Sequence, residues 1–242
     1  MILLDPSSWE IRKTGRKGRG LFATKTIAPG TIIGDYIGKV IRTAEEDTTE
    51  KDGLYLLYYH DYASIYPVDL TATGIHLVNH SCAPNCWITT YKGHTLFFTL
   101  RKIFVGEELT ISYLLPPQET CDPCAHTCIC ESTFCRGTMH LSKTRFEKWR
   151  LFNEAEAKRT KRARISYGKP LAKLQDYPQQ IPDADVYTLY GEAEKTPFEL
   201  KDKTLPSVEE IRRRIRETGK MMYMPALGIT IAGVDDGELI LR

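Results

Sequence analysis

The sequence predicts a mainly β protein with an α-containing C-terminal extension, and three observations support this fold class. Short runs rich in Val, Ile, Thr, Tyr and Phe are separated by turn residues from Glu10 to Tyr113. Five of the seven cysteines then fall between Cys121 and Cys135, in a stretch too irregular to pack as regular structure of its own. Beyond it, the apolar residues take helical spacing. We therefore expect three parts, at residues 10–115, 116–140 and 141–242.

The first part consists of short strand-like runs. Examples are TIIGDYIGKVI, GIHLVNH, CWITTYKGHTLFFTLRKI and ELTISYLL. Glycine and proline punctuate them at Ala28-Pro29-Gly30, Lys92-Gly93 and Val105-Gly106. Since β-branched and aromatic residues favour a pleated, half-buried surface, these runs indicate strands.

The C-terminal part contains two expected helices and a hairpin. The first helix is predicted from Thr144, with Glu147 completing a capping box, to Arg164. The second is predicted from Ser207, with Glu210 completing its box, to Gly219. The end of the chain resembles a hairpin that turns at Gly233–Gly237.

Composition and charge narrow the class of protein. The 242 residues are 42% hydrophobic and 26% charged, which is ordinary for a globular chain. No segment approaches the ~20 apolar residues of a membrane span, and the start has no signal-peptide pattern. We therefore expect a soluble, intracellular protein with no membrane partner.

The basic residues are concentrated in one block. Residues 141–173 carry 11 basic and 3 acidic side chains, although the formal net charge of the chain is only +2. Within the block, Lys158–Arg164 holds five basic residues in seven, which suits a DNA or nucleosome contact or a nuclear import signal. A solvated helix face explains the same residues equally well.

The cysteine-rich loop predicts zinc. Cys128-x-Cys130-x4-Cys135 offers three thiolates at tight spacing, and tetrahedral zinc takes four N or S ligands. The fourth ligand is open on spacing alone. The candidates are Cys121, Cys124, His126, Cys82 and Cys86.

Four separated motifs resemble the SET domain of protein lysine methyltransferases, and the cysteine triplet resembles the post-SET zinc pattern that follows it. In order, the motifs are Arg16-Lys17-Gly18-Arg19-Gly20-Leu21-Phe22, Asp35-Tyr36-Ile37-Gly38, Asn79-His80-Ser81-Cys82-Ala83-Pro84-Asn85 and Gly106-Glu107-Glu108-Leu109-Thr110-Ile111-Ser112-Tyr113. The third and fourth motifs with the triplet carry most of the weight. The resemblance ends near residues 139–141. It implies short strands in small sheets, with a β-clip whose segment 79–85 belongs to a pseudoknot.

The resemblance also assigns ligands. The turn of Lys17, Gly18, Arg19 and Gly20 would contact the methionine portion of S-adenosylmethionine. Asn79 and His80 would contact its adenine and carboxylate, mainly through the backbone. Cys82 would complete the zinc site of Cys128, Cys130 and Cys135. Cys121 and Cys124 then remain surplus, and we expect reduced thiols there rather than a second metal.

For catalysis, the resemblance points to two tyrosines. Tyr113 stands where the family has its catalytic tyrosine, which also contacts the cofactor. Tyr36 matches the family position that lines the lysine channel. On the residues alone, each reads equally well as a packed aromatic.

The predicted function is therefore S-adenosylmethionine-dependent lysine N-methylation of a protein or peptide, with a histone or another basic chromosomal protein as the expected substrate. In a eukaryote this implies the nucleus or chromosome. The other hypothesis is a catalytically silent SET fold that binds chromatin or peptide. Intact Asn79, His80 and Tyr113 favour the enzyme.

Overall fold

The computed structural model of this chain describes most of its residues. The described ranges are 3–42, 57–60, 63–67, 74–92, 94–121, 123–132, 134–159, 168–169, 174–178, 198–200, 202–224 and 226–241. The side chains of Lys158 and Arg159 and the whole of residues 160–164 lie outside them, so the predicted DNA-contact segment stays a prediction.

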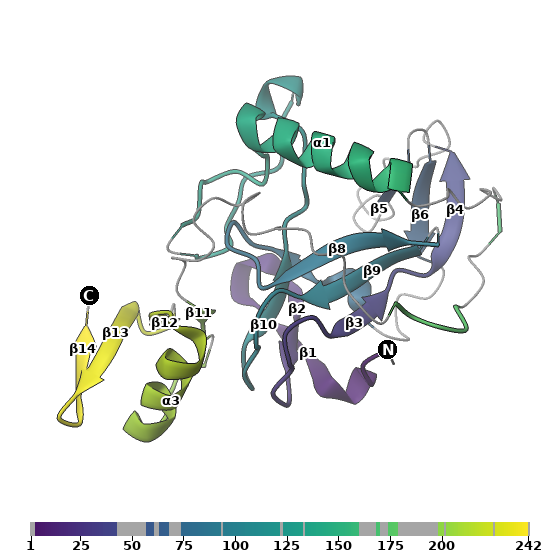
Figure 1. Cartoon of the computed structure of the whole chain (residues 1–242). Coiled ribbons are helices and arrows are strands. Elements are labelled where there is room, and N and C mark those ends of the chain that lie inside the picture. The colour runs from purple at the N-terminus through teal and green to yellow at the C-terminus, as the bar shows by residue number, and fades with distance from the viewer. Residues whose placement is uncertain are drawn as a thin grey trace.

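Over these ranges the strands form four small sheets, which confirms the mainly β class (Figure 1). One sheet has the order β1-β2-β10-β7, built from Trp9–Lys13, Arg19–Ala23, Glu108–Ile111 and Asn79–His80. The second has the order β3-β9-β8, from Ile32–Asp35, His94–Thr99 and Cys86–Tyr91. The third has the order β4-β6-β5, from Gly38–Arg42, Ala63–Pro67 and Leu57–His60. The fourth has the order β11-β12-β13-β14, from Phe198–Glu199, Met222–Met224, Ile229–Asp235 and Glu238–Leu241.

Short 3-10 helices connect several strands. They are Pro6–Ser8, Gly15–Lys17, Ile75–Leu77 and Gln118–Thr120. Two α-helices are described, α1 at Lys143–Arg159 and α3 at Val208–Thr218. Neither has the length and apolar character needed to cross a membrane.

The main core lies where the first two sheets meet. All six residues of β9 are buried, and Leu96, Phe97 and Phe98 place apolar side chains on both faces of the strand. Leu21, Ile33, Phe97 and Leu109 come from four different strands and pack in one cluster. This cluster holds β10 against β2 and thereby positions the site described below.

Helix α1 begins slightly earlier than the capping box of Thr144 and Glu147 predicts. The Ser142 hydroxyl accepts the Arg145 backbone N–H at 3.3 Å, so Ser142 caps the helix. Phe146 and Trp149 pack against a second buried cluster that includes Trp87 and Phe98 of β8 and β9. The helix therefore covers the second sheet (Figure 1).

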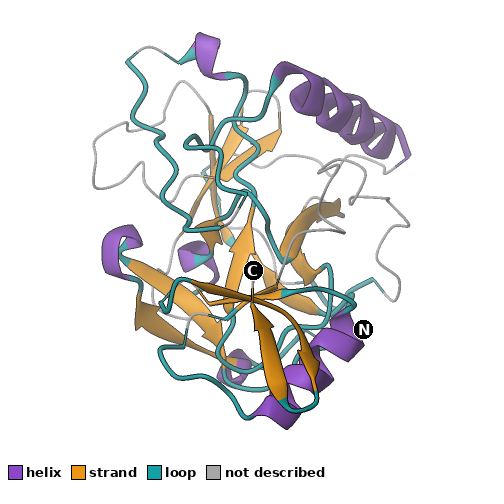
Figure 2. Ribbon diagram, turned by 90° about the vertical axis from the view of Figure 1, so that its left-hand side faces the viewer, coloured by secondary structure: helices purple, strands orange, loops and turns teal. Residues whose placement is uncertain are grey.

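The predicted second helix and hairpin are present in the C-terminal part. Ser207 caps α3 by accepting the Glu210 N–H, and Gly219 ends it in the left-handed region. Strands β13 and β14 turn at Asp236-Gly237, both with positive φ, as a tight hairpin requires. These elements share a small core of their own. In Figure 2 the hairpin projects towards the viewer.

Besides helix α1, several described residues of the C-terminal extension contact the first part of the chain. Arg213 and Arg214 of α3 lie over the ring of Phe104, and Lys102 pairs with Glu217 at 2.5 Å. Separately, the Gly168 N–H donates to the Val40 carbonyl at 2.8 Å, and the Val40 N–H donates to the Lys169 carbonyl at 3.2 Å. The extension therefore packs on the β part instead of hanging free from it.

Asn85 offers a test of how the loop after β7 is held. Its amide donates to the Glu108 carbonyl at 2.8 Å and accepts the Thr110 N–H at 2.9 Å, with the residue buried. Asn85→Ala leaves both backbone groups unpaired and should lower the free energy of unfolding by about 2 to 4 kcal/mol. Urea unfolding would measure it, with Thr89→Ala on β8 as the control. A loss no larger than the control's would contradict the role given to Asn85.

Candidate active site and metal centre

The pairing of β7 with β10 brings two of the sequence motifs together. Strand β7 runs parallel to β10, with Asn79 opposite Thr110 and His80 opposite Ile111. The Ser81 N–H extends this pairing by donating to the Ile111 carbonyl at 2.8 Å. The motif at 79–85 therefore lies directly beside the motif at 106–113.

Tyr113 follows β10 and is held by His80. Its backbone N–H donates to His80 Nδ1 at 3.2 Å, and the two rings meet edge to face with centroids 5.4 Å apart. Burial lowers the pKa of His80 to about 4, so the ring is neutral and Nδ1 can accept. The Tyr113 hydroxyl points to the Val78 carbonyl at 3.4 Å, while the side chain keeps 41% of its surface exposed. Tyr113 is thus an oriented tyrosine at the surface and not a core residue.

The turn at Lys17–Gly20 joins the same site through Glu108. The Lys17 ammonium pairs with Glu108 Oε2 at 2.5 Å, and the Asn79 amide donates to Glu108 Oε1 and to the Arg19 carbonyl, both at 2.9 Å. A Cβ on Gly20 would lie 2.6 Å from Glu108 Oε1, which explains the glycine. Glu108 is a residue to which the sequence analysis gave no role. The motif that contains Glu108 was recognised. Its pairing with Lys17, however, joins residues 91 positions apart, and such a pairing leaves no local pattern in the sequence.

Tyr36 lies in different surroundings. It is buried in the main core cluster together with Val78 and Ile111, and its ring stacks on Phe97 at 6.0 Å. The neighbouring carboxylate of Asp35 pairs with His94 Nδ1 at 2.8 Å. The place of Tyr36 in a lysine channel stays a prediction.

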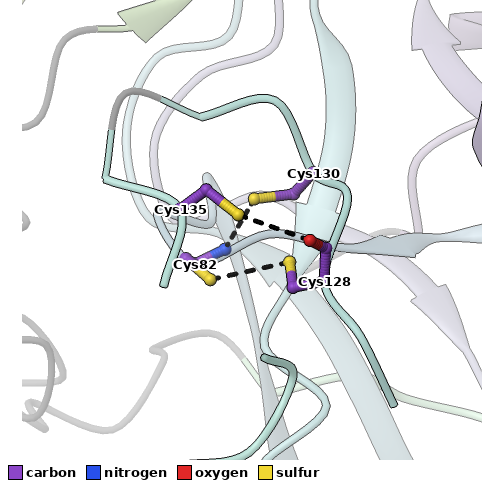
Figure 3. A group of neighbouring side chains, drawn as sticks. All are labelled: Cys82, Cys128, Cys130 and Cys135. Carbon is purple, nitrogen blue, oxygen red and sulfur yellow. Dashed lines mark hydrogen bonds between the residues drawn. The ribbon is translucent and has the colours of Figure 1, made fainter. Parts of the chain in front are cut away.

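Four cysteines predicted as metal ligands meet in one cluster (Figure 3). The sulfur atoms of Cys82, Cys128, Cys130 and Cys135 all lie within 4.8 Å of one another. Cys82 Sγ and Cys128 Sγ are 3.7 Å apart, too far for a disulfide. Tetrahedral zinc with Zn–S bonds of about 2.3 Å places two sulfurs about 3.8 Å apart. The four thiols therefore fit a zinc ion.

The surroundings of the cluster favour a thiolate at Cys130, whereas the pKa values of the Cys82 and Cys128 thiols are raised. Hydrogen bonds from the thiols of Cys128 and Cys82 lower the pKa of Cys130. The Cys82 N–H donates to Cys130 Sγ, and the Arg136 N–H donates to Cys82 Sγ, each at 3.5 Å. His80 Nε2 lies 3.6 Å from Cys82 Sγ, so the metal cluster adjoins the ring that orients Tyr113.

The remaining cysteines have two distinct environments. Cys86 is fully buried and donates to Asn85 Oδ1, and burial raises its pKa to about 12, so it is a neutral packed thiol. Cys121, Cys124 and His126 instead gather with His140, a residue that the sequence analysis did not single out.

One protein-family model matches the β part of the chain. Residues 18–114 match the family model described as "SET domain". The match covers the turn at Lys17–Gly20 from its second residue onward, the strands β2 to β10, and Tyr113.

Several relatives match about half of the chain. The chain is 36% identical over 132 residues to a histone-lysine N-methyltransferase trithorax of Drosophila virilis, covering 49% of this chain and 3% of that protein. It is 33% identical over 129 residues to histone-lysine N-methyltransferase 2B of Homo sapiens, covering 49% and 5%. A third relative, from Schizosaccharomyces pombe, is named histone-lysine N-methyltransferase, H3 lysine-4 specific, with 33% identity, covering 50% and 14%. The chain therefore spans only a small part of the length of these relatives.

Among solved structures, one similar chain is that of KRYPTONITE in complex with mCHG DNA and SAH. The TM-score is 0.47 at 22% identity, over 54% of this chain and 28% of that one.

The Lys17–Glu108 pair can be tested by a double-mutant cycle. The side chains are 10% and 1% exposed, so Lys17→Met strands a buried carboxylate and should cost about 3 to 5 kcal/mol in unfolding free energy. Lys17→Met with Glu108→Gln should recover most of that loss, because the neutral amide can still accept from Asn79. Chemical denaturation measures both, with the exposed Lys143→Met as the control. Additive losses in the double variant would contradict the coupling.

Proposed function

We propose that this chain, whose residues 18–114 match the SET domain family model, is a protein-lysine N-methyltransferase that uses S-adenosylmethionine. One observation carries the proposal: Tyr113, His80 and the turn at Lys17–Gly20 meet around β7 and β10, although they are far apart in the sequence. The names of the relatives support the same activity.

In this proposal the chain positions the reacting groups and takes no covalent part. The Tyr113 hydroxyl and the Val78 carbonyl, 3.4 Å apart, would align a sulfonium methyl with the attacking lysine nitrogen. The lysine nitrogen would gain its C–N bond as the C–S bond of the sulfonium breaks, and the released product would be a neutral thioether. Because free lysine has a pKa of about 10.4, its ammonium must first lose a proton to solvent. An apolar channel and the positive sulfonium both favour that loss.

Two features of the chain fit the cofactor. Lys17, Gly18, Arg19 and Gly20 form a turn whose backbone a ligand can approach closely. Arg136, whose backbone N–H donates to Cys82 Sγ, has two buried guanidinium nitrogens, Nε and Nη2, without a hydrogen-bond partner in the described residues. A ligand carboxylate would satisfy them, and S-adenosylmethionine carries one. When bound, the cofactor supplies the activated methyl group.

Zinc at Cys82, Cys128, Cys130 and Cys135 would have a structural role, since four protein ligands leave no open position. Because Cys82 follows His80, the ion would fix the cysteine-rich loop at 116–140 onto the site. We therefore propose three parts for the chain, namely a SET domain at 10–115, a zinc-binding loop at 116–140 and a C-terminal extension at 141–242. The C-terminal part at 141–242 has a core of its own in its last 45 residues.

The substrate in this proposal is a histone lysine, and the place of action is the nucleus. The relatives are named as histone-lysine methyltransferases, one of them specific for lysine 4 of H3. The basic segment Lys158–Arg164 suits contact with nucleosomal DNA, which would raise the local substrate concentration. The other hypothesis, a silent binding module, would keep histone binding without turnover.

Transfer of labelled methyl groups tests the activity. With nucleosomes as substrate, wild-type protein should label histone, and Tyr113→Phe should lower kcat by about 10²-fold because the methyl loses its alignment. Binding of S-adenosylmethionine should persist in this variant. Tyr91→Phe, a half-buried tyrosine of β8, serves as the control and should keep full turnover.

The outcomes separate the two hypotheses. Cofactor and histone binding without any labelling would indicate the silent module. Labelling that Tyr113→Phe leaves undiminished would contradict the proposed role of Tyr113. Mass spectrometry of the labelled histones identifies the lysine and the number of methyl groups.

Arg136 provides a second test, at the level of binding. If its buried nitrogens hold the cofactor carboxylate, Arg136→Met should raise the Kd for S-adenosylmethionine by about 10-fold or more, since a hydrogen bond to a charged group contributes roughly 1.5–3 kcal/mol. Calorimetry measures it, with Arg145→Met on α1 as the control. An unchanged Kd would show that these nitrogens serve another partner.

A further inference from the structure

Four further metal-ligating side chains converge beside the zinc cluster. Cys121, Cys124, His126 and His140 each offer one ligand atom, and these four atoms all lie within 4.8 Å of one another. They share no residue with the first cluster. Cys121 follows the short helix Gln118–Thr120, whereas His140 precedes α1, so separate segments supply them.

The distances match those of a tetrahedral metal site. His126 Nδ1 lies 3.3 Å from Cys121 Sγ and 3.9 Å from Cys124 Sγ, and His140 Nε2 lies 3.2 Å from Cys124 Sγ. With Zn–S bonds of about 2.3 Å and Zn–N bonds of about 2.0–2.1 Å, a tetrahedral ion separates sulfur and nitrogen ligands by about 3.6 Å. The observed values scatter around this separation.

His140 is oriented as a metal ligand usually is. Its Nδ1 lies 2.5 Å from the Pro116 carbonyl, which can only accept, so Nδ1 carries the proton. The lone pair of Nε2 then faces Cys124. A backbone carbonyl behind a ligating histidine fixes its tautomer and ring orientation in known metal sites. His140 is buried, and thus its ring is held before any ion binds.

We propose that Cys121, Cys124, His126 and His140 bind a second zinc ion. Two thiolates and two neutral imidazoles are a common structural zinc set, and their charges cancel that of the ion. Four protein ligands leave no position for substrate, which makes the site structural. This proposal is the alternative to the expectation of a loop with reduced, unliganded thiols.

The two ions would hold opposite ends of one hairpin. Residues 126–140 form a short ladder in which the Cys128 N–H donates to the Gly137 carbonyl and the Met139 N–H to the His126 carbonyl, both at 3.0 Å. The first cluster takes three of its ligands, Cys128, Cys130 and Cys135, from within this hairpin, and the second takes His126 and His140 from its base. The pair of ions would therefore fix the hairpin in position and in shape.

The second ion would also stabilise the segment that follows Tyr113. Leu115 pairs with His140, and the Leu141 N–H donates to the Leu115 carbonyl at 3.0 Å. Leu114, which lies between Tyr113 and Leu115, has a φ of +56°, a strained value for a leucine. Anchoring His140 through zinc would stabilise this strained segment next to Tyr113.

Zinc content of the full-length protein tests the proposal directly. Purified wild-type protein should contain two zinc ions per chain, and Cys121→Ser with Cys124→Ser should contain one. Cys86→Ala, which removes a buried thiol outside both clusters, should keep two. Because the first site shares no ligand with this pair, the double serine variant should still bind S-adenosylmethionine.

Cobalt substitution gives a second readout that does not depend on zinc counting. Six thiolates would bind two cobalt ions, and the double serine variant loses two of them, so the thiolate-to-cobalt absorption should fall by about one third. His126 is exposed, so His126→Ala leaves the core intact and should change the cobalt d–d bands. This variant decides the matter if the double serine variant does not fold.

Several results would overturn the proposal. One zinc per wild-type chain, two zinc ions in the double serine variant, or cobalt bands unchanged by His126→Ala would each do so. A disulfide between Cys121 and Cys124, seen as a 2 Da mass loss (about two hydrogens) in their peptide, would replace the metal site by a redox pair. None of these results depends on methyl transfer, so the proposed function stands or fails separately.

Discussion

The parallel pairing of β7 with β10 is the contact on which the candidate site depends. It involves only Asn79 and His80, yet the residues on either side of it serve every part of the site. Asn79 reaches Glu108, His80 holds the backbone of Tyr113, and Cys82 joins the metal cluster. A one-residue shift of this register would turn each side chain to the opposite face. Two kinds of contact hold this register. Val78 and Ile111, beside the pairing, pack in the main core, and the side-chain amide of Asn85 donates to the Glu108 carbonyl of β10.

Glu108 shows how charge couples the turn to the strands. An ionised carboxylate that is 1% exposed is tolerated only when other groups satisfy it. Lys17 and Asn79 do so, and each comes from a different predicted cofactor motif. The backbone of the turn at 17–20 thus takes its place from a buried charge and not from its own local preferences. A preformed turn lowers the entropy that a ligand must lose on binding.

The sequence predicted those features whose chemistry is local. Ser207, Glu210 and Gly219 mark the ends of α3, and the apolar runs mark β3, β9 and β10. The clustering of Cys82 with the cysteine triplet could be predicted only through family resemblance, because spacing left five candidates for that ligand. His140 was missed since it lies 14 residues from its nearest ligand partner and has no second histidine at zinc-finger spacing. The role of Glu108 and the packing of Leu174 and Tyr177 depend on tertiary contacts that no local pattern records.

The two metal clusters differ in what they connect. The first takes Cys82 from the strand region and the other three ligands from the loop, so an ion there joins two parts of the chain. The second lies wholly within residues 121–140, so an ion there shapes the loop itself. The loop has few buried apolar side chains, and metal–ligand bonds can replace a hydrophobic core in such segments. A loop already shaped by the second ion would present Cys128, Cys130 and Cys135 together, so that docking onto Cys82 costs less conformational entropy.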